Sequence, residues 1–156
     1  MEYVSADEGS TACIFCDGLA RNDDEATHIV LRTQRVFVIL NAFPYNTGHL
    51  MVAPNRHIGE LADLAPGERH DLMDVTSVAS GLLKEALKAQ GFNIGINLGR
   101  VAGAGIPGHL HVHIVPRWDG DTNFMPVVGD TKVLPEMTED TYTKLRPLFE
   151  ARFRSL

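Results

Sequence analysis

The segment that offers the most chemistry contains three histidines that alternate with apolar residues: His109, His111 and His113. Because side chains alternate between the two faces of a β-strand, these imidazoles share one face, about 6.5–7 Å apart along the strand. Leu110 and Val112 point to the other face, where they can anchor the strand in a core. Three imidazoles on one face cost free energy unless polar groups partner them. The run therefore indicates a functional site, in which one imidazole attacks phosphorus and its neighbours bind a metal or phosphate oxygens.

Two other interpretations of the histidine run stay open. The first is that these are three ordinary surface histidines on an edge strand. The second is that the run holds a catalytic metal, as in metal-dependent oxygenases or hydrolases. Such sites recruit a carboxylate or a fourth histidine at a characteristic spacing, and the sequence contains no His-x-His-x-Asp-His arrangement.

A pair of cysteines, Cys13 and Cys16, has the spacing of half a tetrahedral zinc site. In a reducing compartment the pair is not expected to form a structural disulfide. A redox-active pair usually begins a helix after a strand, whereas here an acidic segment follows the cysteines. Metal binding, a redox couple and two unrelated free cysteines are therefore all compatible with the spacing.

The periodicity of apolar residues predicts the elements that carry these groups. Strands rich in β-branched and aromatic residues are expected at 28–32, 36–40, 49–53, 92–98 and 110–116. A long amphipathic helix is expected to begin at Pro66 and to stop before Gly91, and a C-terminal helix is expected at 139–154 despite Pro147. Because short turns join the first three strands, we expect antiparallel pairing and an α+β fold.

Composition and charge limit the class of protein. The chain has 156 residues, 44% hydrophobic and 22% charged, which fits a single domain over residues 1–156 with a flexible polar arm at 1–12. The net charge of −6 argues against nonspecific binding of nucleic acid, which needs many cationic contacts to phosphates. The acidic N-terminus does not resemble a secretion signal, and no apolar run is long enough to span a bilayer. We therefore expect a cytoplasmic protein without a membrane partner.

Four stretches of the sequence together resemble the histidine triad (HIT) family. They are NAFPYNTGHLMVAPNRH (41–57), GFNIGINLGRVAGAG (91–105), GHLHVHIVPRW (108–118) and DGDTNFMPVVGDTKVLPE (119–136). The resemblance runs from about Cys13 to Glu136, and the last stretch is most similar to bacterial members related to diadenosine tetraphosphate phosphorylases and hydrolases. It implies a five-stranded antiparallel sheet with one long and one C-terminal helix, assembled as a homodimer.

The resemblance also implies a reaction. In the family the middle histidine of the triad, here His111, attacks the α-phosphorus of a nucleotide and forms a covalent nucleotidyl-histidine. His113 would contact phosphate oxygens and stabilise the charge of the transition state. Water, inorganic phosphate or another acceptor then releases the nucleotide. The implied substrate is a nucleotide or dinucleoside polyphosphate, and Mg²⁺ could arrive with its phosphates.

Further matching positions imply roles in nucleotide binding. Asn41 matches an asparagine that binds ribose, although an ordinary turn residue is the alternative. His49 occupies a position where the family often has a supporting histidine, and Asn97 matches a position near the phosphates. The glycine-rich loop before the triad would bring backbone N–H groups to the phosphates. Its expected members are Gly103, Ala104, Gly105 and Ile106.

Members of the family that carry the cysteine pair complete a zinc site with two histidines. The matching residues in this chain are Cys13, Cys16, His57 and His109. The implied zinc is structural, because four protein ligands leave no coordination position open for water.

The sequence departs from the hydrolase members of the family at two positions. Those members carry Gln followed by Ser or Thr, four and three residues before the first histidine, where this chain has Gly105 and Ile106. Transferase and phosphorylase branches share this change. We therefore expect a diadenosine tetraphosphate phosphorylase or a nucleotidyltransferase. A nucleotide-binding protein with little catalysis is the alternative.

Overall fold

The computed structural model describes residues 13–122 and 136–154, and its core is a five-stranded antiparallel sheet. In chain order the elements are α1 (Ile14–Arg21), α2 (Asp24–Thr27), β1 (Ile29–Arg32), β2 (Val36–Leu40), β3 (Leu50–Pro54), η1 (Leu61–Asp63), α3 (Pro66–Leu87), β4 (Gly91–Ile96), η2 (Arg100–Ala102), β5 (Val112–Arg117) and α5 (Thr138–Arg154). This architecture confirms the predicted α+β class, with one long helix and one C-terminal helix.

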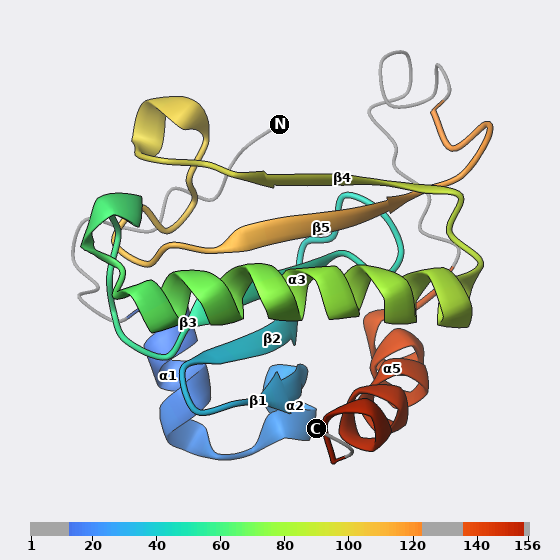
Figure 1. The fold of residues 1–156 in the computed structure, drawn as a ribbon. Coiled ribbons are helices and arrows are strands. Elements are labelled where there is room, and N and C mark those ends of the chain that lie inside the picture. The colour runs from blue at the N-terminus through green and yellow to red at the C-terminus, as the bar shows by residue number, and fades with distance from the viewer. Residues whose placement is uncertain (1–12, 123–135, 155–156) are drawn as a thin grey trace.

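The sheet has the strand order β1-β2-β3-β5-β4. β5 lies between β3 and β4 in the interior of the sheet. It contains His113 and directly follows His109 and His111. β4 forms one edge and has a single neighbouring strand in the described part of the chain. Figure 1 shows α3 crossing one face of the sheet, with α5 below it, where α5 packs against α3 and β1.

The alternation of side chains along β2 divides its apolar residues between two cores. Val36, Val38 and Leu40 belong to the main core under α3 and α5. Phe37 and Ile39 belong to a smaller core on the opposite face, against the first turn of α1. Because every side chain of β2 is buried, both faces of the sheet are covered at this strand.

The long helix α3 begins where the sequence predicts but ends earlier. Pro66 occupies the first turn, where its missing N–H costs no hydrogen bond. The Glu68 carboxylate accepts the N–H of Ala65 at 2.8 Å and so satisfies a donor at this end. The expectation that Gly91 stops the helix is wrong. Lys88 adopts the left-handed conformation (φ 56°) directly after the helix, and Gly91 begins β4.

Three strands begin later than predicted, β3 by one residue at Leu50, and at β1 and β5 the first predicted residues have other backbone partners. His28 is the C-cap of α2 in the left-handed conformation (φ 57°), so β1 begins at Ile29. The N–H of Leu110 donates to the carbonyl of Ile58 at 2.7 Å, and β5 begins at Val112. Backbone hydrogen bonds set both boundaries, and the pattern of apolar side chains does not report them.

The cysteine segment is helical, which the sequence pattern did not predict. α1 starts directly after Cys13 and contains Cys16, and it ends where Asn22 adopts the left-handed conformation (φ 53°). Asp23 then caps α2 by accepting the N–H of Ala26 at 3.2 Å. The acidic segment that follows the cysteines therefore contains the junction of two short helices.

Some expectations concern residues that the structure does not describe. The predicted arm at 1–12 and residues 123–135 of the family-like stretch lie outside the described ranges. That the whole chain forms one domain stays a prediction. Within residues 13–122 and 136–154, no helix is long and apolar enough to cross a membrane.

Candidate active site

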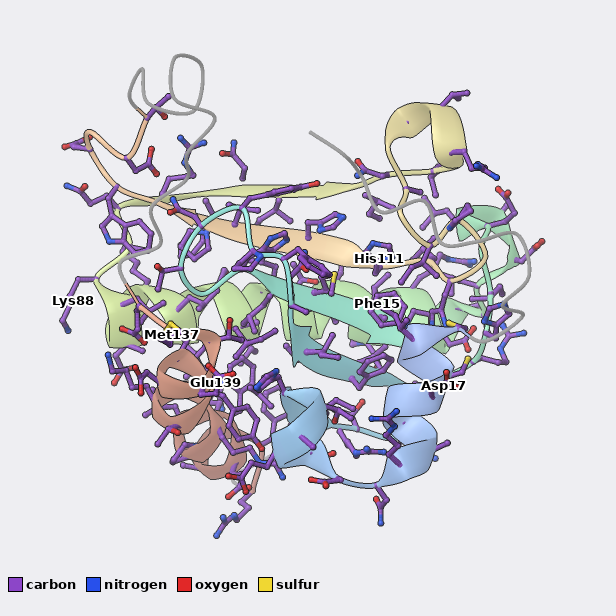
Figure 2. The ribbon with its side chains drawn as sticks, turned by 180° about the vertical axis from the view of Figure 1, so that it is seen from behind. Phe15, Asp17, Lys88, His111, Met137 and Glu139 are labelled. Atoms are coloured by element: carbon purple, nitrogen blue, oxygen red, sulfur yellow. The ribbon has the colours of Figure 1, made fainter. Side chains whose placement is uncertain are left out.

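The histidine run lies on the face of the sheet opposite α3. Val112 and Ile114 point into the main core under α3, so the histidines that alternate with them face the other way. Figure 2 looks onto this face and shows His111 next to Phe15, which lies in the first turn of α1. His111 is buried, so the groups around its ring decide what the ring can do.

The tautomer of His111 follows from its hydrogen bond. Its Nδ1 lies 2.8 Å from the carbonyl oxygen of His109, and a carbonyl can only accept, so Nδ1 carries the proton. The other ring nitrogen, Nε2, then has its lone pair available. Burial lowers the pKa of His111, which keeps the ring neutral at neutral pH. A neutral imidazole with a lone pair on Nε2 is a nucleophile for phosphorus.

A chain of hydrogen bonds gives His113 the opposite tautomer. The backbone N–H of Tyr45 donates to Nδ1 of His49 at 3.1 Å, so the proton of neutral His49 lies on Nε2. That Nε2–H lies 2.9 Å from Nδ1 of His113 and donates to it. Nδ1 of His113 is therefore an acceptor, and its proton lies on Nε2.

The two neighbouring rings thus present complementary groups. The ring centroids of His111 and His113 lie 4.7 Å apart, and one Nε2 has a lone pair while the other carries a proton. Burial, together with any charge on His111, lowers the pKa of His113 to about 4, so this proton donor is neutral at neutral pH. Side by side, a nucleophile and a neutral donor can attack a phosphorus atom and stabilise the oxygen that becomes charged.

Two features of the β2–β3 loop place His49 behind this pair. Gly48 has φ 74°, and a Cβ there would lie 2.4 Å from Cδ1 of Leu87, so the loop needs glycine to pass α3. Asn41 accepts the N–H of Phe43 on its Oδ1 at 2.9 Å. Its Nδ2 therefore faces His49 Nδ1 at 3.3 Å, which favours the same tautomer. Asn41 is partly exposed, whereas His49 is 0% exposed.

The glycine-rich loop uses part of its own donor capacity. The N–H of Gly103 donates to Arg100 O at 3.0 Å, and the N–H of Ala104 donates to Gly99 O at 3.3 Å. Both N–H groups thus hold the turn together, and their expected place beside the phosphates stays a prediction. Asn97 donates from Nδ2 to Gly103 O at 3.3 Å and ties the loop to the end of β4.

The next two residues of this loop keep their donors available. The N–H groups of Gly105 and Ile106 donate to no other residue in the described part of the chain. Gly105 is exposed, and a Cβ added to it would meet no atom within 4 Å. Ile106 packs against the smaller core and fixes the loop to the sheet. Two backbone donors and an open space therefore lie directly before the histidine run.

The predicted metal ligands come together in one cluster. Cys13, Cys16, His57 and His109 each contribute one ligand atom, and all four atoms lie within 4.8 Å of one another. Cys13 Sγ lies 3.3 Å from His109 Nδ1. Cys16 Sγ lies 3.4 Å from His57 Nδ1 and 3.6 Å from His109 Nδ1. In tetrahedral zinc sites, bonds of ~2.3 Å to sulfur and ~2.1 Å to nitrogen separate these ligand atoms by roughly 3.6 Å. The donor set and its spacing therefore fit zinc.

Backbone contacts orient the histidines of this cluster. Nε2–H of His109 donates to the carbonyl of Pro54 at 2.8 Å, which leaves the Nδ1 lone pair facing the thiols. A Cβ on Gly108 would lie 3.3 Å from His57 Nε2, so glycine permits the close approach of this ring. Burial and the neighbouring Cys13 raise the pKa of the Cys16 thiol, and a bound cation would reverse this by stabilising the thiolate.

His111 and His113 lie outside this cluster, which is the one group of metal-binding type among the described residues. Their Nδ1 atoms are engaged by a carbonyl and by an N–H, respectively. The geometry therefore does not support the alternative in which the whole histidine run holds a catalytic metal.

Sequence reasoning missed two parts of the site. Phe15 is 0% exposed, and its ring centroid lies 5.0 Å from that of His111 and 5.1 Å from that of His109. An aromatic residue between two candidate ligands was the available signal. The backbone N–H of Tyr45 fixes the tautomer of His49, and no residue type in the sequence reports a backbone donor.

Comparison with known proteins agrees with this geometry. The family model described as HIT domain matches residues 22–120, more than half of the chain. A zinc-bound histidine triad family protein from Mycobacterium smegmatis has a similar structure, with a TM-score of 0.75 and 26% identity, over 95% of this chain and 100% of that one. A hypothetical histidine triad nucleotide-binding protein from Sulfolobus tokodaii has a TM-score of 0.71 and 28% identity, over 92% and 93% of the two chains.

A curated relative is similar in sequence over a longer stretch than the family model. The AP-4-A phosphorylase of Mycobacterium tuberculosis is 47% identical over 118 residues, which are 76% of this chain and 60% of the relative. The chain therefore spans less than two thirds of the length of that phosphorylase.

Proposed function

Because the chain belongs to the HIT domain family, we propose that it transfers a nucleotidyl group from a dinucleoside polyphosphate through a covalent nucleotidyl-His111 intermediate. The observation that carries this proposal is the opposite tautomers of two adjacent rings. His111 has a lone pair on Nε2 because its Nδ1–H donates to a carbonyl. His113 has a proton on Nε2 because its Nδ1 accepts from His49. Similarity to an AP-4-A phosphorylase supports the class of substrate.

In the first step one bond forms and one bond breaks. The Nε2 lone pair of His111 attacks the α-phosphorus, and the bond from phosphorus to the bridging oxygen breaks. The nucleoside polyphosphate leaves with that electron pair. Nε2–H of His113 donates a hydrogen bond to the oxygen that gains charge, which stabilises the transition state.

In the second step an acceptor releases the nucleotide from His111, and we propose inorganic phosphate as that acceptor. Gly105 leaves open space and a backbone donor where hydrolase members of the family carry a glutamine side chain. A phosphate oxygen attacks the nucleotidyl phosphorus, and the imidazole leaves with the electron pair of the P–N bond. Diadenosine tetraphosphate would then give ATP and ADP, whereas attack by water would give ATP and AMP.

The nucleotide-binding roles divide between exposed and buried residues. We assign phosphate contacts to the N–H groups of Gly105 and Ile106, with Asn97 supporting their loop. Partly exposed Asn41 is assigned to the ribose. Buried His49 is assigned to holding the tautomer of His113 rather than to contact with the nucleotide. The arrival of Mg²⁺ with the substrate stays a prediction.

The four clustered ligands are assigned to a structural zinc ion. They are Cys13, Cys16, His57 and His109. Their spacing supports this assignment, as does the zinc-bound state of the similar Mycobacterium smegmatis protein. When bound, zinc would cross-link the start of α1 to the segment that precedes β5, and four protein ligands leave no position for water.

The reaction products test the proposed function. The purified protein is incubated with diadenosine tetraphosphate, with and without inorganic phosphate, and the nucleotides are separated by chromatography. We expect ATP and ADP only with phosphate, and no turnover in His111→Asn. His70→Asn is the matched control, because His70 is exposed and belongs to α3. ATP and AMP would indicate hydrolysis instead. Tight nucleotide binding without turnover would favour the alternative of a binding protein.

A homodimer through β4 is part of the proposal. β4 is an edge strand, and its Ile94 is 48% exposed next to partly buried Phe92 and Ile96. An apolar edge strand can pair with the same strand of a second copy. Ile94→Lys should therefore shift the mass measured by analytical ultracentrifugation from dimer to monomer, while Met73→Lys on the exposed side of α3 should not. A monomeric wild-type protein at micromolar concentration would overturn this part.

A further inference from the structure

Phe15 connects two parts of the site that the proposed function treats separately. It lies between the clustered cysteines Cys13 and Cys16, and it is fully buried. Its ring centroid lies 5.1 Å from that of His109, with an angle of 66° between the ring planes. It lies 5.0 Å from the centroid of His111, with an angle of 56°. The side chain therefore touches both His109, a candidate metal ligand, and His111, the proposed nucleophile. Figure 2 shows Phe15 next to His111.

The ring of His111 depends on packing for its orientation. Among the described residues it makes one hydrogen bond, from Nδ1 to the carbonyl of His109, which fixes one corner of the ring. The tilt about that corner is set by the rings that pack on it, Phe15 and His113. A nucleophile must meet phosphorus along a defined line, so a change in tilt lowers the rate of attack.

Phe15 is held by the smaller core, where its ring packs edge-on against Phe37, and the helical turn that carries it is also tied to the ligand cluster. The N-cap of α1, Cys13, makes no side-chain capping hydrogen bond. The far end of the helix is held by Arg32, which donates to the carbonyls of Gly18 and Leu19. In the described part of the chain, the polar side-chain contacts of the first turn are those of Cys13 and Cys16 with the histidines of the cluster. Thiol–imidazole contacts are weak compared with metal–ligand bonds.

We propose that Phe15 is a positioning residue through which metal occupancy of the cluster sets the orientation of His111. The proposal rests on the proposed function, because it assigns His111 as the nucleophile. With zinc bound, the first turn of α1 is fixed and Phe15 holds the ring in its attacking orientation. Without zinc the turn loosens, and the ring of His111 loses that support while its hydrogen bond to the His109 carbonyl persists.

Single-turnover kinetics test the coupling. The rate of adduct formation from diadenosine tetraphosphate is measured for zinc-loaded and chelated protein, for wild type, Phe15→Leu and Ile14→Ala. Ile14 is the matched control, because it lies between the same cysteines but is 61% exposed. In wild type and Ile14→Ala, chelation should slow adduct formation roughly tenfold to a hundredfold. Zinc-loaded Phe15→Leu should be slow already, with unchanged zinc content and KM, and chelation should slow it little further.

Two outcomes of these kinetics would overturn the proposal. One is a Phe15→Leu protein that keeps zinc and reacts as fast as wild type. The other is a Phe15→Leu protein that keeps the full effect of chelation. If Phe15→Leu loses zinc or does not fold, the nitrogen resonances of the His111 ring in wild-type protein test the proposal instead.

Nuclear magnetic resonance of the imidazole nitrogens provides a readout that needs no reaction. In wild-type protein, zinc removal should broaden or shift the ring signals of His111 but leave the tautomer of His113 unchanged. Unchanged His111 signals would overturn the proposal. The measurement also separates the two hypotheses: a zinc-dependent His111 ring without any adduct would refute the proposed function while leaving the coupling intact.

Discussion

His109 and His113 lie at the two ends of the same run, yet their rings are held in opposite ways. His109 donates from Nε2 to the carbonyl of Pro54 and turns its Nδ1 lone pair toward the thiols. His113 accepts on Nδ1 from His49 and so carries its proton on Nε2. The residue type is the same, so the difference teaches that fixed neighbouring groups select the chemistry by selecting the tautomer. The two ends of the run can therefore be tested separately by substitution.

Breaking the His113 end should have the largest effect. His113→Phe keeps a ring in place but removes the hydrogen-bond donor, so turnover of diadenosine tetraphosphate should fall about 10²–10³-fold. Steady-state kinetics should place the loss in kcat, because the donor acts on charge that develops in the transition state. His70→Phe controls for the loss of an exposed histidine. A loss of less than tenfold would mean that this Nε2–H does not act on the reacting oxygen.

Breaking the His109 end should affect stability first. Zinc at a hundredfold excess over its Kd would add about 2.7 kcal/mol to the free energy of unfolding. For a chain of this size that is a rise in Tm of roughly 5–10 °C, measured by calorimetry with zinc and with a chelator. Cys16→Ser removes a ligand and should abolish the difference. The same shift in Cys16→Ser would mean that zinc stabilises the protein from another site.

Substituting His49, which donates to Nδ1 of His113, should lower activity less than substituting His113 itself. His49→Phe removes the donor to Nδ1 and frees the tautomer of His113, so kcat should fall roughly tenfold to a hundredfold with KM little changed. His49→Gln can still donate from its amide and should recover part of the activity. If both variants lose the same activity, His49 acts through packing and not through the proton it supplies.

The pH dependence of stability sharpens the comparison further. Burial and the charge of His111 lower the pKa of folded His113 to about 4, while the unfolded residue keeps the ordinary value of 6.5. Between these values the unfolded chain binds more protons, so stability is complete above pH 6.5 and falls as the pH drops toward 4. One group contributes at most about 1.4 kcal/mol per pH unit. Urea unfolding across this range should give a shallower loss for His113→Phe, and an identical slope would contradict the assignment.

The sequence was sufficient where side-chain pattern decides structure. Alternation predicted that Leu110 and Val112 enter the core while the histidines face the other side, and the main core contains both residues. The strands and both long helices were also predicted to within a few residues. The four metal ligands came from the family resemblance rather than from spacing, and the fold brings their ligand atoms into one cluster.

The sequence did not predict features that depend on backbone conformation and backbone hydrogen bonds. Lys88 ends α3 in a left-handed conformation that its residue type does not favour. The tautomer of His49 depends on the N–H of Tyr45, which becomes a neighbour only through the turn of the loop. The N–H groups of Gly103 and Ala104 close their own turn, and a glycine-rich composition does not indicate which N–H groups the loop itself uses.

Trapping the intermediate tests the central claim most directly. Protein mixed with diadenosine tetraphosphate in the absence of phosphate is quenched at high pH, where phosphorus–nitrogen bonds to histidine persist, and digested for peptide mass spectrometry. We expect one adenylyl group per site on His111, and its release as ADP when phosphate is added before the quench. Sustained turnover with no adduct on His111, or with the adduct on another residue, would contradict the account.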